Sequence, residues 1–246
     1  HNSPVARDET EHEVLLFPDT FTNYSTPAVG RAAVRALEAA GVRVELAEEV
    51  TASGRASFSK GYLDVARERA ETNVDALAPA VADDRAVVVV EPSDAVMLQS
   101  DYLDLLSGPA VERVAGATYG VCEYLDRAGL DLSAAFDGEG RLVYHGHCHQ
   151  AATARDHHAV GVLRRAGYTV EPLDSGCCGM AGSFGYEAEH YSMSRAIGEI
   201  LDDQVEDATG RVVAPGASCR TQIDDLVTGE RPPHPVEMLD DARVES

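Results

Sequence analysis

The stretch DSGCCGMAGSFGY, residues 174–186, is the most informative part of this chain and decides how the rest is read. It places two neighbouring thiols, Cys177 and Cys178, in a glycine-rich turn, where packing rarely needs them. Cys148 lies upstream in HGHCH and Cys219 lies downstream in PGASC. Four sulfur ligands suit an iron–sulfur cluster or a zinc ion. We therefore take these four cysteines as candidate metal or cofactor ligands.

Charge separates the chain from several classes of protein. Its 246 residues carry 42 acidic and 20 basic side chains, a formal net charge of −22, and Lys60 is the only lysine. Nucleic acid would be repelled, so DNA or RNA binding is excluded as a function. At about 1 M salt the screening length falls to roughly 3 Å, which relieves self-repulsion. We interpret the charge as halophilic adaptation to a salt-rich cytoplasm; an acidic docking surface for a basic partner is the alternative.

The remaining global features concern location and completeness. The sequence contains no run of about 18 apolar residues, so no transmembrane helix is expected, and we find no basic-then-apolar signal segment. Five cysteines make an odd count for a disulfide framework, so a reducing interior is expected. The chain begins with His1, which favours a fragment or a processed piece, and residues 1–12 are polar and are expected to form a linker.

Apolar β-rich runs alternate with helical patterns, which predicts an α/β fold of parallel βαβ units. The expected strands are Glu13–Phe17, Val42–Leu46, Ala86–Val90, Arg141–Tyr144, Thr169–Leu173 and Arg211–Ala214. The expected helices are Ala28–Ala40, Tyr62–Val81, Ala110–Ala128, Ala151–Ala166 and Glu187–Val205.

The two halves of the chain resemble each other at an offset of about 125 residues. Gly54 matches Gly179 and Ser93 matches Ser218 at this offset, and repeats of this kind indicate an internal duplication. We expect two tandem, pseudo-repeated Rossmann-like halves, residues 13–135 and residues 136–246. The same offset maps the four cysteines onto residues without a thiol, namely Asn23, Ala52, Ser53 and Asp94. Only the second half is therefore expected to keep a thiolate site.

Three stretches make the chain similar to the cysteine-rich CCG domain family: FPDTFTNY at residues 17–24, HGHCHQ at residues 145–150, and residues 174–186. CCG domains occur in iron–sulfur subunits of glycolate oxidase, anaerobic glycerol-3-phosphate dehydrogenase and lactate-utilisation complexes, and in heterodisulfide reductase. The similarity is strongest to the C-terminal part of proteins that fuse an FAD-linked oxidase, a ferredoxin-type module and paired CCG domains. It runs from about Val14 to Leu239.

The resemblance implies an iron–sulfur cluster, of the 4Fe–4S type, on Cys148, Cys177, Cys178 and Cys219. It also implies partners: a flavin-dependent dehydrogenase domain or subunit, a ferredoxin-type module, and a membrane-linked quinone as acceptor. FAD is expected upstream or on a partner, because this chain lacks a flavin-binding region. The chain departs from the family at two points. The C-x-x-C that often ends each copy is absent, since neither Gly216 nor Gln222 is a cysteine, and the first copy has no ligand cysteine at all. A cytoplasmic location, with peripheral attachment at the inner face of the membrane as an extension, fits these partners.

The strand pattern places all four cysteines just after strands, where open parallel sheets bind ligands. A helix expected from Glu187 would point its N-terminal N–H groups at the thiolates. His145, His147 and His149 alternate along the chain, so His147 and His149 are further candidate ligands. The remaining candidates are expected to have no metal. Cys122 is expected to be a thiol of the apolar core, His190 a packing residue and His234 part of a turn. His157 and His158 are expected on a solvated helix face, and Asp94, as a lone carboxylate, is not expected to bind a metal.

Three functions remain open. The first is electron transfer in a flavin-linked oxidoreductase that oxidises lactate, glycolate or glycerol 3-phosphate, with no catalytic residue on this chain. The second is a structural zinc site, since four thiolates can simply hold loops together. The third is thiol or disulfide chemistry of the heterodisulfide-reductase type.

Overall fold

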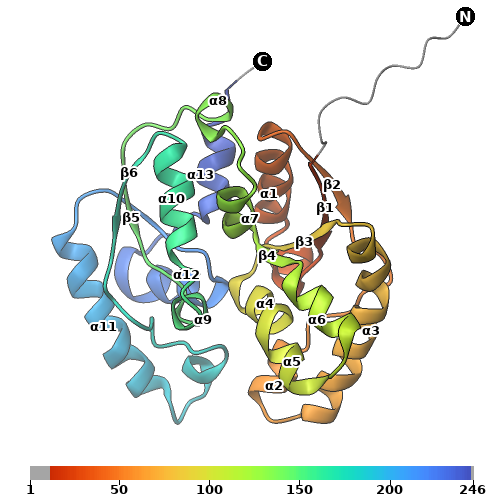
Figure 1. Ribbon diagram of the computed structural model, residues 1–246. Coiled ribbons are helices and arrows are strands. Elements are labelled where there is room, and N and C mark those ends of the chain that lie inside the picture. Colours follow the sequence, from red (N-terminus) through yellow and green to blue (C-terminus); the bar gives the residue numbers. More distant parts are fainter. Residues whose placement is uncertain (1–11, 245–246) are drawn as a thin grey trace, which may run out of the picture.

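The computed structural model describes residues 12–244 (Figure 1). Residues 1–11, which fall in the expected linker, lie outside the described residues, and His12 is already the first residue of a strand. The first sheet contains β1 (His12–Phe17), β2 (Val42–Leu46), β3 (Ala86–Val89) and β4 (Thr118–Gly120). The second sheet contains β5 (Arg141–Tyr144), β6 (Thr169–Pro172) and β7 (Arg211–Val213).

Helices lie between and around these strands. Those that precede β5 are η1 (Phe21–Ser25), α1 (Pro27–Ala39), α2 (Arg55–Ser59), α3 (Leu63–Ala82), α4 (Pro92–Val96), η2 (Met97–Asp101), α5 (Tyr102–Leu105), α6 (Pro109–Gly116), α7 (Val121–Arg127) and α8 (Leu132–Ala135). Those that follow β5 are α9 (Cys148–Ala152), α10 (His157–Arg165), η3 (Phe184–Tyr186), α11 (Tyr191–Asp207), α12 (Ala217–Ile223), η4 (Asp224–Thr228) and α13 (Pro235–Asp241). Among the described helices, none is both long and apolar enough to cross a bilayer.

The sheets confirm the predicted α/β class. Their strand orders are β2-β1-β3-β4 and β6-β5-β7, and every pairing between these strands is parallel. The first three strands of one sheet therefore have the order and direction of the three strands of the other. This is the arrangement that an internal duplication would leave. The exact boundary between the halves, between residues 135 and 136, stays a prediction.

Two of the predicted helices are wrong in part. The pattern at 110–128 holds two helices, α6 and α7, with the edge strand β4 between them. The chain leaves α6 after Gly116 because the Ala117 carbonyl accepts the Val87 amide of β3, so the next residues continue as a strand paired with β3. The pattern at 151–166 is likewise two helices, α9 and α10, separated by a turn in which Ala154 has a φ of 55°.

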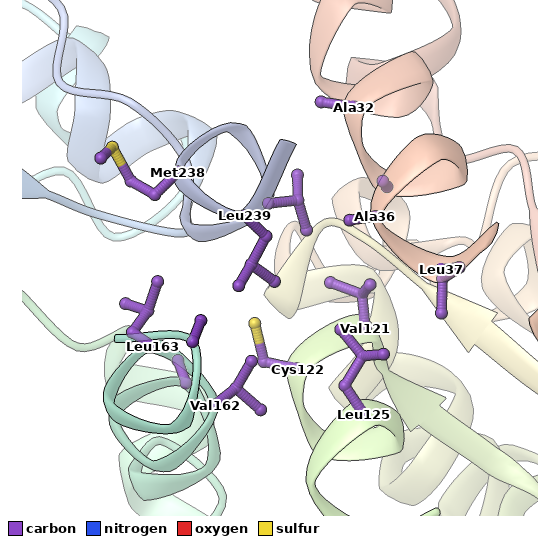
Figure 2. Close-up of a cluster of buried hydrophobic side chains, with 14 of the residues drawn as sticks. Ala32, Ala36, Leu37, Val121, Cys122, Leu125, Val162, Leu163, Met238 and Leu239 are labelled. Atoms are coloured by element: carbon purple, nitrogen blue, oxygen red, sulfur yellow. The ribbon is translucent and has the colours of Figure 1, made fainter. Parts of the chain in front are cut away.

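One apolar core joins the two sheets. Alternate residues of β1 face opposite sides: Val14 and Leu16 enter this shared core, whereas Leu15 and Phe17 enter a second cluster that involves α3 and α6. The shared core lies between α1 and α7 on one side and α10 and α13 on the other, and α1 packs directly on α13 (Figure 1). Figure 2 shows its centre, where Leu239 of α13 lies among side chains of α7 and α10. The halves are therefore fused through a common interior.

Candidate metal centre

The four predicted ligand cysteines lie together at the carboxyl end of the second sheet. Cys148 is the first residue of α9 and follows β5, the Cys177–Cys178 pair follows β6, and Cys219 lies in α12 after β7. Their side chains interact in one series of neighbours, in which the Cys148 and Cys178 thiols both donate to Cys177 and the Cys178 thiol also donates to Cys219. Three segments that are distant in sequence thus bring four sulfur atoms to one place as a series of neighbours, and the Cys178 and Cys219 sulfurs lie within 4.8 Å of each other.

Backbone amides of the glycine-rich turn are directed at these sulfurs. The Gly179 amide donates to the Cys177 Sγ at 3.4 Å, and the Ala181 amide donates to the same atom. The Met180 amide donates to the Cys178 sulfur. The turn achieves this with positive φ angles at Gly176, Gly179, Ala181 and Gly182, a backbone form that concentrates N–H groups on one side.

Proton sharing divides the four thiols into two kinds. Hydrogen bonds from Cys148 and Cys178 hold the pKa of Cys177 far below its usual range, and a hydrogen bond from Cys178 does the same for the pKa of Cys219. The pKa values of the two donors, Cys148 and Cys178, are raised for the same reason. A metal ion or cluster would replace these shared protons, since the thiolate is the ligand.

Three histidines line the same site. His145 is 1% exposed, and a ligand nitrogen of its ring lies within 4.8 Å of the sulfurs of Cys178 and Cys219. Its Nδ1 is 2.6 Å from the Ser175 Oγ. His147 packs against Gly216, and the ring of His149 meets that of His147 edge-on with centroids 5.2 Å apart. The sequence pattern favoured His147 and His149 as further ligands, which stays a prediction. His147 is buried and interacts electrostatically with Cys219, and the structure adds His145, whose ring is grouped with the Cys178 and Cys219 sulfurs.

The helix that follows the glycine-rich turn differs from the expectation. It begins at Tyr191 rather than Glu187, after the short η3. It contacts the turn through Ser194, whose hydroxyl is 3.9 Å from the Met180 sulfur. Among the contacts of the described residues, the amide donors to the sulfurs come from the turn and from His149. The turn itself therefore does what the helix N-terminus was expected to do.

Comparison with known proteins fits this geometry. The family model of the CCG cysteine-rich domain matches residues 142–224, which include all four cysteines. Residues 142–224 are therefore similar to a CCG domain.

Three relatives each match most of the chain. One subunit of the anaerobic glycerol-3-phosphate dehydrogenase of Escherichia coli K12 is 29% identical over 250 residues, which cover 96% of this chain and 61% of the relative. D-2-hydroxyglutarate dehydrogenase of the same organism is 28% identical, over 94% of this chain and 23% of the relative. Lactate utilization protein A of Bacillus pumilus is 27% identical, over 84% of this chain and 87% of the relative. The chain thus spans only part of the first two proteins.

The missing C-x-x-C cysteines of the CCG domain have structural replacements. A Cβ at position 216 would lie 2.5 Å from the His147 Cδ2, so only glycine lets that ring and Cys219 approach each other. Gln222 instead donates its Nε2 to the Ser194 carbonyl of α11 at 3.1 Å. Both positions therefore support the surroundings of the four cysteines.

The first half keeps the backbone of the CCG turn without its thiols. Gly54 has a φ of 90° and faces the Ala66 carbonyl, as Gly179, with a φ of 96°, faces the Ser194 carbonyl. The residues matched to Cys178 and Cys219 are Ser53 and Asp94, and the Ser53 hydroxyl donates to the Asp94 carboxylate. A buried oxygen pair thus occupies the place of a sulfur pair.

Strand register corrects one equivalence. Val14 pairs with Ala86, and Leu142 pairs with Arg211, so the offset between β1 and β5 is 128 although it is 125 between β3 and β7. Cys148 then corresponds to Thr20, not to Asn23.

Asp94 is 6% exposed, and burial raises its pKa to about 7. Glu91, in the same loop region, accepts the Ala217 amide at the start of α12 at 3.0 Å. The first half therefore supports the helix that carries Cys219.

The other candidate residues lie outside the centre. Cys122 is buried in the shared core, and burial raises its pKa to about 12 (Figure 2). His158 is buried rather than solvated, because its Nδ1 lies 2.6 Å from Asp126. His190 stacks on Phe184, as a packing role predicts, and His234 caps α13.

Replacing Gly179 with alanine is expected to disrupt the centre, whereas replacing Gly176 is not. A Cβ at 179 would lie 2.3 Å from the Ser194 carbonyl oxygen, but a Cβ at 176 meets nothing within 4 Å. Both positions have positive φ, so each variant bears a cost of about 1–2 kcal/mol for the left-handed backbone. We expect Gly176→Ala to keep its bound metal and Gly179→Ala to lose most of it, as measured by metal analysis of purified protein. Equal metal content in the two variants would contradict this account of the turn.

Proposed function

We propose that this chain is the electron-transfer part of a flavin-linked oxidoreductase and that its second half holds one iron–sulfur cluster, of the 4Fe–4S type. Cys148, Cys177, Cys178 and Cys219 are the proposed ligands. The observation that carries the proposal is the series of four neighbouring sulfurs from three loops, with backbone amides directed at them. When bound, such a cluster supplies one-electron transfer.

The residues present suit this group. Four thiols form the donor set that clusters require, and hydrogen bonds to the sulfurs together with burial set the potential. The His145 side chain interacts with Cys219, and the buried Nδ1 of His147, which has no hydrogen-bond partner among the described residues, offers a further donor beside the sulfurs. Cys178 and Cys219 are buried, whereas Cys148 and Cys177 are half-buried, so we place the electron path on the side of the last two.

The relatives suggest the reaction that the whole protein serves. Their names include dehydrogenases of glycerol 3-phosphate and of D-2-hydroxyglutarate and a lactate utilization protein. We propose oxidation of a small 2-hydroxy acid or of glycerol 3-phosphate on a flavin-bearing domain or subunit. A ferredoxin-type module and a membrane-linked quinone complete the proposed path. A salt-rich cytoplasm, with peripheral attachment to the membrane, is the proposed setting for a chain of net charge −22.

The anaerobically purified chain tests this proposal. We expect iron and acid-labile sulfide in equal amounts and broad visible absorption that decreases when dithionite is added. A colourless protein with one zinc ion per chain would replace the cluster with a structural metal site. Iron-free protein that reduces disulfide substrates would favour thiol chemistry instead.

A further inference from the structure

The FPDTFTNY stretch, residues 17–24, is the one family-like motif that the metal centre does not use. It leads from the end of β1 through η1 into α1. Asp19 is fully buried and fixes the turn, since its carboxylate accepts the Thr22 amide at 2.9 Å and the Thr22 hydroxyl at 2.6 Å. On the other side, Thr22 lies against Gly30 of α1, where a Cβ would approach it to 3.3 Å. The segment is therefore held in one position beside the helix.

A pocket of about 350 Å³ opens between this segment, α1 and the end of β2. Its apolar walls come from Leu16, Val34 and Leu46. The volume lies within the roughly 300–1,000 Å³ that small-molecule sites have in general. The pocket also lies at the carboxyl ends of β1 and β2, which is where open parallel sheets bind ligands. All its lining residues belong to the first half, so it is separate from the cysteines.

The charge of the lining is opposite to that of the protein. Two arginines and no acidic residue line the pocket, in a chain with 42 acidic and 20 basic side chains. Arg35 is held by the carboxylate of Asp240, which also pairs with Arg243. Arg31 is exposed and forms no ion pair with any residue that the structure describes. An unpaired guanidinium beside apolar walls, on so acidic a protein, fits a ligand that brings its own negative charge.

We propose that this pocket binds a small amphiphilic anion, with an apolar body against Leu16, Val34 and Leu46 and one anionic group on Arg31. Asn23, which also lines the pocket, offers an amide to the same group. The site lies in the segment of the first half that corresponds to the Cys148 loop of the second. The half without ligand cysteines thus has a binding site of different chemistry in that position.

Fluorescence of anilinonaphthalene sulfonate, an amphiphilic anion, tests this site in the full chain. We expect one bound molecule per chain. Its affinity should be about tenfold weaker in Arg31→Gln, because the variant lacks the positive charge that faces the anionic group; a tenfold change corresponds to about 1.4 kcal/mol of binding free energy. Leu46→Glu, which adds an acid to the exposed wall, should weaken binding at least as much. Arg113→Gln removes an exposed arginine of α6 and serves as the matched control, with unchanged affinity.

Competition identifies the anionic part of the interaction. Decanoate should displace the probe, and decanol, which has the same chain without the charge, should compete far more weakly. Equal affinity in the wild type and Arg31→Gln, or equal competition by decanoate and decanol, would overturn the proposal. Iron content is expected to be the same in all these variants, so this result is independent of the outcome for the metal centre.

Discussion

Cys178→Ser is expected to abolish bound iron. Cys178 is the central member of the sulfur series, since its side chain contacts both Cys177 and Cys219. It is 3% exposed and shares its surroundings with the buried His145. A serine hydroxyl is not ionised at neutral pH and cannot take the place of a thiolate for a soft metal centre. We therefore expect iron to fall from full occupancy to background, together with the visible absorption.

Two controls define what this loss means. Cys122→Ala removes a cysteine of the shared core, and we expect this variant to keep its iron. That result would show that iron loss in Cys178→Ser does not follow from the number of thiols alone. Asp94→Ala removes the residue matched to Cys219 in the first half, and it should also keep its iron. Equal iron in Cys178→Ser and the wild type would refute the four-cysteine site. Loss of iron in Asp94→Ala would refute the view that the second half alone holds the cluster.

Leu239→Ala is expected to destabilise both halves at once, by about 2–5 kcal/mol, the usual range for a fully buried leucine. Leu239 is 0% exposed and lies in α13, at the point where the shared core connects the two sheets (Figure 2). The alanine would leave a cavity between α7, α10 and α13. Urea unfolding followed by circular dichroism should show one transition at a clearly lower midpoint.

A surface leucine provides the comparison. Leu103 is 46% exposed in α5, so Leu103→Ala should change the free energy of unfolding by no more than about 0.5 kcal/mol. If Leu239→Ala gave two separate transitions, of which only one moved, the halves would be independent units. That result would contradict the common interior inferred from α1, α7, α10 and α13.

Much of the fold could be predicted because its signals are local. The predicted strands at 42–46 and 141–144 have their observed bounds, since short β-rich runs between glycine turns leave little choice. The single helix predicted at 110–128 is wrong because β4 is only three residues long and lies between two helical patterns. Pairing with β3, rather than any preference of its own sequence, makes it a strand.

The sequence by itself determined which residues are the candidate ligands: four thiols after strand ends, beside a glycine-rich turn, and none of them in the first half. Residue type and spacing are enough for this, because parallel strands bring their carboxyl ends to one edge. Only the tertiary structure decided that His145 lies with the sulfurs, that Glu91 holds the start of α12, and that a pocket opens beside Arg31. These contacts depend on how distant segments pack, and packing between distant segments leaves no periodic pattern along the chain.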